Sequence, residues 1–318
     1  MLDILGITGP IYLCIVLGFV VTRMGLFAKA DMRVFGKFVI NLALPALLFN
    51  ALSQRSMAEI LNGQYLLAYA LACGAVVAVG FVWMRFVARR SMSFSSMVAM
   101  GMACPNSGFV GYPVALLTLG ASTAGVSLAL NMVVENLLII PILLALADLD
   151  DDGKGEWHQA LAQTFKGLLR NPLIIAIVGG MVMSFMQWQL PTPLARTVNL
   201  FSQASGALSL FVIGGSLVGL QVQGMRATLA QIGLGKLLLH PLVMLAVLWF
   251  VVPMDDPQLR TAALMTSAMP MMGIYTILSQ RHGHEGVASA ALLVTTFTSF
   301  FTLSGLLWVL GQMPGWLG

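Results

Sequence analysis

Charged residues are scarce in this sequence. Asp, Glu, Lys and Arg together make up 9% of its 318 residues, whereas hydrophobic residues make up 58%. Soluble domains carry roughly 25% charged residues, so this composition excludes a soluble globular protein. The net charge of +4 then indicates basic loops beside a lipid bilayer, and not a nucleic-acid partner. The composition predicts an all-α integral membrane protein.

Cysteines and catalytic signatures are few as well. The sequence has 3 cysteines, Cys14, Cys73 and Cys104, each in a separate apolar segment. An odd number without paired spacing favours neither disulfides nor a zinc site. The apolar segments also lack an aspartate pair, an HExxH motif and a serine–histidine pair within a motif. We therefore expect no catalytic residues, no metal site and no cofactor.

Ten apolar segments are long enough to cross a membrane. Their approximate bounds are residues 4–21, 34–52, 65–87, 95–119, 125–147, 172–188, 197–220, 229–252, 259–280 and 287–310. A polar stretch with the run DLDDDGKGEWHQ separates the first five from the last five and predicts a solvated linker. The expected organisation is a first repeat at residues 1–147, the linker at 148–170 and a second repeat at 171–318.

Lysine and arginine are distributed unevenly between the two sets of loops. The loops after odd-numbered segments carry thirteen, namely Arg23, Lys29, Arg33, Lys37, Arg85, Arg89, Arg90, Lys154, Lys166, Arg170, Arg226, Lys236 and Arg281. The other loops carry three: Arg55, Arg196 and Arg260. Because basic residues favour the cytoplasmic side, the sequence predicts a cytoplasmic linker and extracytoplasmic termini, in the cell inner membrane.

The two halves share weak internal similarity. GPIYLCIVLG at 9–18 matches NPLIIAIVGG at 171–180 at an offset of 162 residues. ACPNSG at 103–108 matches AMPMMG at 268–273 at an offset of 165, and AGVSLA at 124–129 matches EGVASA at 285–290 at 161. Five segments on each side of a linker place the halves in opposite orientations, so these ordered matches indicate two inverted five-helix repeats.

The fourth and ninth segments contain features that interrupt a helix. The stretch GMACPNSGFVGYP at 101–113 holds two prolines and three glycines, and Pro270 stands at the corresponding place in the ninth segment. Pro105 removes a backbone donor and clashes with the preceding turn. In hydrocarbon, freed backbone groups are tolerated only when they are buried in protein or line a cavity. Paired interrupted segments are typical of a transport site near the bilayer midplane.

Three motifs resemble the auxin efflux carrier family, and the similarity covers essentially the whole chain. They are PNSGFVGYP at 105–113, NLALPALLF at 41–49 and SAMPMMGIY at 267–275. The family includes bacterial proteins described as malonate transporters. The resemblance implies a ten-helix fold related to sodium/proton antiporters and bile-acid symporters. Helices four and nine would cross in an X, with a carboxylate bound beside the crossing.

The resemblance also implies positions for individual residues. Asn106 would lie at the crossing of the fourth helix, followed by Gly108, Gly111 and Pro113, and Pro270 would mark the second break. One position departs from the family pattern. The repeat of Pro45 in the second segment falls on Ala207 in the seventh, where the family would carry proline more often.

A site of this kind suits an anion. A half-helix that begins at a break offers unpaired N–H groups and about half a positive charge. Asn106 can donate through its amide and Ser107 through its hydroxyl, although Asn106 could instead satisfy the backbone of the broken helix. The predicted substrate-binding residues are Pro105, Asn106, Ser107, Gly108, Asn131, Pro270, Met271, Met272, Gly273 and Tyr275.

Glu135 is the single acidic residue deep in a segment, four residues after Asn131 and on the same helix face. A buried carboxyl group within a membrane is a functional candidate by default. Glu135 is therefore the proton-coupling candidate, and a structural carboxylate bonded to the broken helix is the alternative.

Lys236 and His240 form another pair spaced by four residues. We expect Lys236 to extend to the cytoplasmic interface, and His240 to be a capping or packing residue.

The sequence therefore predicts a secondary active transporter or uniporter, and not an enzyme. It would move a small organic acid anion, a malonate-like dicarboxylate or an auxin-like carboxylate, by alternating access around the crossing. A coupled proton, a coupled sodium ion and a homodimer stay open as partners. An intramembrane enzyme or a receptor without transport activity is the alternative. The enzyme lacks the usual catalytic pairings, and a receptor would leave the paired breaks unexplained.

Overall fold

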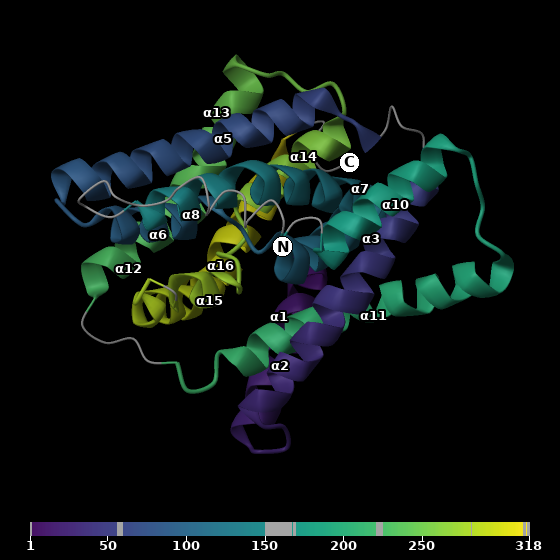
Figure 1. Cartoon of the computed structure of the whole chain (residues 1–318), viewed down its shortest axis with the longest axis horizontal. Coiled ribbons are helices and arrows are strands. Elements are labelled where there is room, and N and C mark those ends of the chain that lie inside the picture. The colour runs from purple at the N-terminus through teal and green to yellow at the C-terminus, as the bar shows by residue number, and fades with distance from the viewer. Residues whose placement is uncertain are drawn as a thin grey trace. The chain divides into compact units, whose positions relative to one another are not determined.

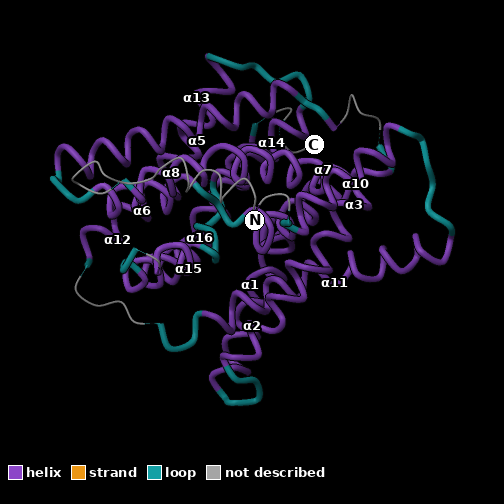
Figure 2. Tube along the Cα trace, in the orientation of Figure 1, coloured by secondary structure: helices purple, strands orange, loops and turns teal. Residues whose placement is uncertain are grey.

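The described part of the chain is helical throughout. The computed structural model describes residues 2–55, 60–149, 167, 170–220, 225–280, 282–313 and 316, with side chains omitted at 2–5 and 7. Helices connected by loops account for this part of the chain, and no strand occurs in it (Figure 2). The expected all-α class is confirmed. Most of the linker predicted at 148–170 lies outside the described residues, as does Arg281.

The chain divides into two compact units, each made from three separate stretches. The first unit comprises residues 1–63, 107–132 and 169–219, and the second comprises 64–106, 133–168 and 220–318. The first unit contains α1 (Leu2–Arg23), α2 (Lys29–Phe38), η1 (Val39–Ala43), α3 (Leu44–Ser53), η3 (Ser107–Gly111), most of α7 (Tyr112–Val134), α10 (Pro172–Phe185) and α11 (Thr192–Ser216) (Figure 1).

The second unit contains the remaining elements. These are α5 (Gly63–Val82), η2 (Trp83–Val87), α6 (Met92–Ala103), η4 (Glu135–Ile139), α8 (Ile140–Asp148), α12 (Arg226–Leu234), η5 (Gly235–Leu239), α13 (His240–Phe250), α14 (Pro257–Ser267), α15 (Tyr275–Gln280) and α16 (Glu285–Gln312). The elements labelled η are single π-helical turns within longer helices.

Glycines set the closest helix packing in the first unit, where α1 packs along α11 and α3 along α10. A Cβ atom at Gly18 would collide with the backbone carbonyl of Phe211, and one at Gly214 with the carbonyl of Ile15. Helices approach this closely in membranes through small residues, because apolar burial supplies no driving force there. Gly18 and Gly214 therefore fix the contact between α1 and α11.

The second unit packs α6 against α8 and α12, with α16 behind α12. A Cβ at Gly235 would meet the Met102 side chain, and one at Gly101 would lie 3.4 Å from the ring of Tyr275. Every residue from Ser95 to Ala103 is buried. The end of α6 is thus enclosed by protein before the chain reaches Pro105.

Among the described residues, four of the five π-helical turns end two residues before a proline. The turns η1, η3, η4 and η5 are followed by Pro45, Pro113, Pro141 and Pro241 respectively. Proline leaves the carbonyl four residues earlier without its helical donor, and in each case this carbonyl lies inside the π turn. For Pro113 the freed carbonyl is that of Phe109, which accepts a hydrogen bond from Ser209 Oγ at 3.0 Å.

Six described helical runs are long and apolar enough to cross a membrane, and three shorter apolar helices accompany them. One run, Ser107–Asp148, has 42 residues and contains Gly120 in a non-helical conformation with φ 84°. Gly120 falls between the fourth and fifth predicted segments. The uninterrupted helix α11 agrees with Ala207 replacing a proline there. The count of ten spans and the inverted repeat stay predictions.

The outward faces of the helices carry large apolar side chains. Phe250, Phe185 and Phe297 have 81%, 77% and 69% of their surface exposed. Exposed apolar area on this scale is typical of a surface that contacts lipid. Together with the apolar runs, it identifies a multi-pass membrane protein.

Candidate functional site

Two helices of the second unit stop abruptly inside apolar segments. Helix α6 ends at Ala103 and helix α14 ends at Ser267, while the next helical residues are Ser107 and Tyr275. Cys104 is extended, with φ −94° and ψ 107°. Pro105 and Pro270 follow these ends, and each lacks the N–H that would continue the helix. The breaks predicted from the two prolines are therefore present.

The two broken stretches bond to each other through their backbones. Asn106 N–H donates to the Pro270 carbonyl at 2.8 Å, and Met272 N–H donates to the Cys104 carbonyl at 3.2 Å. Pro105 and Met271 form an antiparallel bridge. Each break thus satisfies backbone groups that the other has freed, as apolar surroundings require.

The predicted substrate-binding residues fall into two groups. Within the second unit, the bridge brings together Pro105, Asn106, Pro270, Met271 and Met272. Asn106 has 3% of its surface exposed, Met271 0% and Met272 7%.

The remaining predicted residues lie around this bridge or in the other unit. Tyr275 is buried, with its ring against Gly101, and Gly273 is half-buried. Ser107, Gly108 and Asn131 belong to the first unit, where Ser107 and Asn131 are buried. Their part in a common site stays a prediction.

Lys236 does not extend to the membrane interface, so that expectation is wrong. Its side chain is completely buried. Nζ donates to the backbone carbonyl of Ser267 at 2.7 Å and lies 2.8 Å from Nδ1 of His240. These contacts hold the ammonium group inside the second unit, at the residue where α14 breaks. Lys236 lies on the π turn η5, which continues helix α12 without a break.

His240 links Lys236 to the other break. Its Nε2 lies 3.6 Å from Sγ of Cys73, and this thiol lies 3.9 Å from the carbonyl of Ala103, the last residue of α6. When the Lys236 ammonium donates to Nδ1, the ring proton sits on Nε2 and faces the sulfur. A continuous polar chain therefore runs from the end of α14 to the end of α6.

Glu135 is as deeply buried as predicted, with 2% of its surface exposed. Tyr69 Oη donates to Glu135 Oε1 at 2.7 Å. Glu135 also acts electrostatically on Lys236, so the second unit buries one acidic and one basic group within reach of each other. Buried charges of opposite sign partly compensate for their loss of hydration.

Sequence reasoning missed the buried Lys236–His240 pair because it placed the start of this segment at residue 229, whereas the helix begins at Arg226. Lys236 lies ten residues after the first residue of α12, Arg226. A helix rises about 1.5 Å per residue, so Lys236 begins about 15 Å along this helix. Its side chain is too short to return to the end of such a helix.

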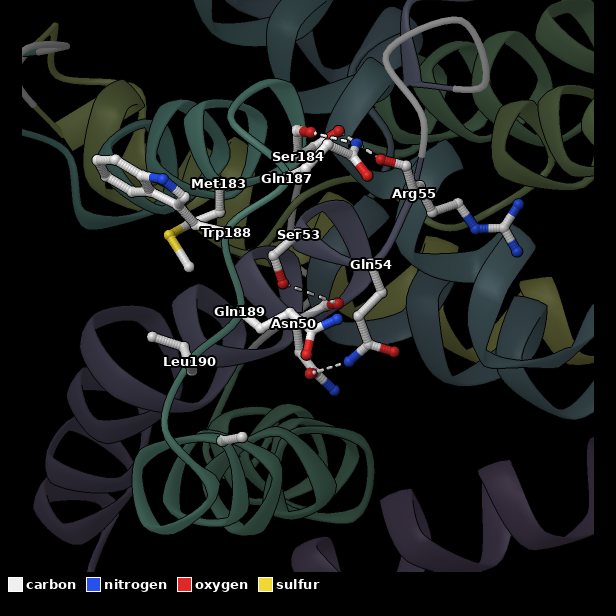
Figure 3. Close-up of a pocket in the computed structure, with 11 residues that line it drawn as sticks. Asn50, Ser53, Gln54, Arg55, Met183, Ser184, Gln187, Trp188, Gln189 and Leu190 are labelled. Atoms are coloured by element: carbon white, nitrogen blue, oxygen red, sulfur yellow. Dashed lines mark hydrogen bonds between the residues drawn. The ribbon is translucent and has the colours of Figure 1, made fainter.

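A polar pocket of about 480 Å³ lies in the first unit. Its lining residues are distant in sequence from both helix breaks. It is lined by Asn50, Ser53, Gln54, Arg55, Met183, Ser184, Gln187, Trp188, Gln189, Leu190 and Ala195 (Figure 3). Gln54 Nε2 donates to Asn50 Oδ1 at 2.6 Å, and Ser184 Oγ donates to the Arg55 carbonyl. The guanidinium group of Arg55 extends away from Asn50 and Gln54 (Figure 3). The pocket therefore presents amides and hydroxyls without a facing charge.

Known proteins match this chain over nearly its full length. A family model described as "Membrane transport protein" matches residues 7–308. A protein of Rhizobium meliloti strain 1021 named "Putative malonate transporter" is 29% identical over 323 residues, which is 99% of this chain and 98% of that protein. The uncharacterized transporter YfdV of Escherichia coli strain K12 is 25% identical over 307 residues, 94% of this chain and 95% of that protein.

Proposed function

Because the chain belongs to the membrane transport protein family, the auxin efflux carrier family that its motifs resemble, we propose that it is a secondary transporter for a small organic acid anion. The observation that carries this proposal is the pair of helix breaks bonded to each other at Asn106 and Pro270. Interrupted helices buried within protein are the usual place for a substrate in secondary transporters.

The proposed architecture is ten membrane-spanning helices in two inverted five-helix repeats. Helices lie in each of the ten segments that hydropathy selects, and Gly120 separates the fourth from the fifth. The backbone bonds between the two breaks support a crossing of the fourth and ninth helices. Alternating access around this crossing would expose the substrate to one side of the inner membrane at a time.

The proposed substrate site is at the break of the fourth helix. Asn106 would donate its amide to a carboxylate, and the Ser107 hydroxyl and the first N–H groups of η3 would add further donors. Asn131 is a further buried amide on α7. In the second unit, Pro105, Pro270, Met271, Met272, Gly273 and Tyr275 would complete the lining, and Gly108 stays a candidate from the sequence. No bound metal or cofactor is required for such recognition.

Malonate-like dicarboxylates are the first substrates to test, because one full-length relative is named for malonate. An auxin-like carboxylate is the second class, which the family resemblance suggests. Transport could be coupled to a proton, with Glu135 as the candidate from sequence, or to sodium. It could also be driven by membrane potential alone, at about 2.3 kcal/mol per charge for each 100 mV.

Counterflow in proteoliposomes tests the proposal. Vesicles containing the purified chain and unlabelled malonate should accumulate labelled malonate from outside, and protein-free vesicles should not. Unlabelled mono-, di- and aromatic carboxylates added outside would rank the substrates by competition. A monodisperse protein that exchanges none of these acids would contradict transport of a small organic acid anion.

A further inference from the structure

Every terminal carbonyl of α14 has a donor. The last four accept hydrogen bonds, in order from Leu264 to Ser267, from the Ser267 hydroxyl, the N–H of Ala268, the N–H of Met269 and the Lys236 ammonium. The first three donors come from the same turn of the chain. The fourth comes from another helix, thirty-one residues away. The amino group of Lys236 thus occupies the broken end of α14.

This arrangement follows from the electrostatics of a helix end. The unpaired carbonyls of a helix C-terminus carry about half a negative charge, which a nearby cation stabilises. Transporters with interrupted helices use such ends, together with unwound carbonyls, to coordinate the coupling cation. Here the ammonium of Lys236 bonds to the Ser267 carbonyl, and the Cys73 thiol lies against the Ala103 carbonyl at the end of α6.

We propose that the Lys236–His240 pair is the coupling-cation site of this carrier, a site that binds a proton where other carriers bind sodium. The inference rests on the proposed transport function and moves the proton from Glu135 to this pair. Nζ and Nδ1 lie 2.8 Å apart, so the two bases share one proton. Two cations at this distance would repel each other strongly, and the pair therefore holds one positive charge when it is protonated.

The proton balance of a cycle is simple. A proton entering from one side converts a neutral amine and a neutral imidazole into a pair with a single positive charge. Its release to the other side restores the neutral amine, whose N–H can still donate to Nδ1 of His240. The charge beside the Ser267 carbonyl, at the end of α14, is present only in the protonated state, and His240 and Cys73 connect this position to the Ala103 carbonyl at the end of α6. Proton binding is thereby linked to the geometry of both breaks.

The groups around the pair suit this role. Cys73 of α5 lies 3.6 Å from His240 Nε2 through its sulfur, and Glu135 on η4 acts electrostatically on Lys236. Glu135 Oε1 accepts a hydrogen bond from Tyr69 Oη at 2.7 Å, which holds the carboxyl group in place. A fixed carboxylate balances the protonated pair without itself exchanging a proton.

Lys236→Arg is the main test, in proteoliposomes that exchange labelled malonate. Arginine keeps the positive charge and the donors for Ser267, but it does not release its proton. We expect exchange to persist while accumulation driven by a pH gradient falls by about tenfold, the effect of losing about 1.4 kcal/mol of coupling. Arg226→Met, which removes an exposed basic residue of α12, is the matched control and should retain both activities.

His240→Gln is a second test, for the case in which the larger arginine side chain of Lys236→Arg disturbs folding. Glutamine can bond to Lys236 but cannot share a proton, so we again expect exchange without accumulation. Full accumulation by a folded Lys236→Arg or His240→Gln protein would overturn the inference. Absence of exchange in the wild-type protein would instead count against the transport function itself.

A measurement made without substrate tests the proposed cation site independently of the proposed transport function. If Lys236 occupies the cation position, replacing sodium chloride by choline chloride should leave the melting temperature of the purified wild-type protein unchanged. A ligand that binds only the folded state raises stability in proportion to its occupancy. A sodium-specific rise in melting temperature would place sodium at the site and overturn the inference, whether or not a substrate is known.

Discussion

Asn106 is buried at the point where the chain leaves α6, and its backbone N–H is already used in the bond to Pro270. Its side-chain amide is the part of the residue that a substrate could engage. We expect Asn106→Ala to leave expression and monodispersity near normal and to weaken carboxylate binding by about 1–3 kcal/mol, the range for hydrogen bonds to a charged group. Equilibrium binding of labelled malonate to purified protein measures this change.

The same substitution at Ser107 is the matched comparison. Ser107→Ala removes a single hydroxyl donor beside the break, so its effect should be smaller than that of Asn106→Ala. Unchanged affinity in a folded Asn106→Ala protein would mean that the amide serves the broken backbone and not the substrate.

Glu135 accepts a hydrogen bond from Tyr69, and substitution of Glu135 tests whether it is a counter-charge or a proton carrier. Glutamine preserves the size of the side chain and can still accept from Tyr69 Oη, but it cannot titrate. We expect Glu135→Gln to exchange malonate and to retain accumulation driven by a pH gradient, at a reduced rate because Lys236 loses a nearby negative charge. Uptake in proteoliposomes with and without a pH gradient measures both quantities.

The opposite pattern would identify Glu135 as the proton carrier. Exchange without accumulation in the glutamine variant, beside normal accumulation by Lys236→Arg, would show that the carboxyl group is the carrier. Tyr69→Phe removes the bond to Glu135 while leaving its charge and serves as the control for local packing.

At the level of helices, proline positions made much of the architecture predictable. Pro105 and Pro270 located both breaks, and the prolines at 45, 113, 141 and 241 each follow a π-helical turn. These effects are local, since a proline always removes one donor from the preceding turn. The packing of the helices decides which of the freed backbone groups form hydrogen bonds with one another. The bond between Asn106 and Pro270 joins residues that no spacing in the sequence relates directly.

The position of Lys236 also depends on a tertiary contact that the sequence does not predict. A lysine near the expected start of an apolar segment usually extends to the interface. Here the helix begins earlier, at Arg226, and a carbonyl at the end of α14 offers a partner inside the protein. Lys236 is buried because it bonds to this carbonyl of Ser267. The sequence does not show this contact, which depends on how α12 and α14 pack.

The contact between α1 and α11 gives a prediction for stability. A methyl group at Gly214 would collide with the backbone carbonyl of Ile15, which cannot move without displacing α1. We expect Gly214→Ala to destabilise the protein by about 1–3 kcal/mol, the usual cost of overpacking. The melting temperature of the purified protein in detergent measures the change.

Gly206→Ala is the matched control on the same helix. A Cβ at this position has no atom within 4 Å, and alanine favours helix more than glycine does. Its melting temperature should equal or exceed that of the wild-type protein. Equal melting temperatures for the two variants would mean that α1 and α11 do not pack as closely as their backbones indicate.

For the whole molecule, the distribution of basic residues predicts the orientation in the membrane. The burial of Lys236 removes one residue from the thirteen on the predicted cytoplasmic side, which leaves twelve against three. The bias keeps its sign, so both termini should be extracytoplasmic and the linker cytoplasmic. The linker lies largely outside the described residues, and its side of the membrane must be measured chemically.

Single cysteines at two positions make that measurement. In a background with Cys14 replaced by serine, Gly155→Cys in the linker should resist an impermeant maleimide in intact cells and react after the membrane is opened. Gln189→Cys, between α10 and α11, should react in intact cells because its loop is predicted to be extracytoplasmic and Gln189 is exposed. Cys73 and Cys104 are buried and should contribute little labelling. The reverse labelling pattern would invert the topology, and with it the side from which the proposed proton enters.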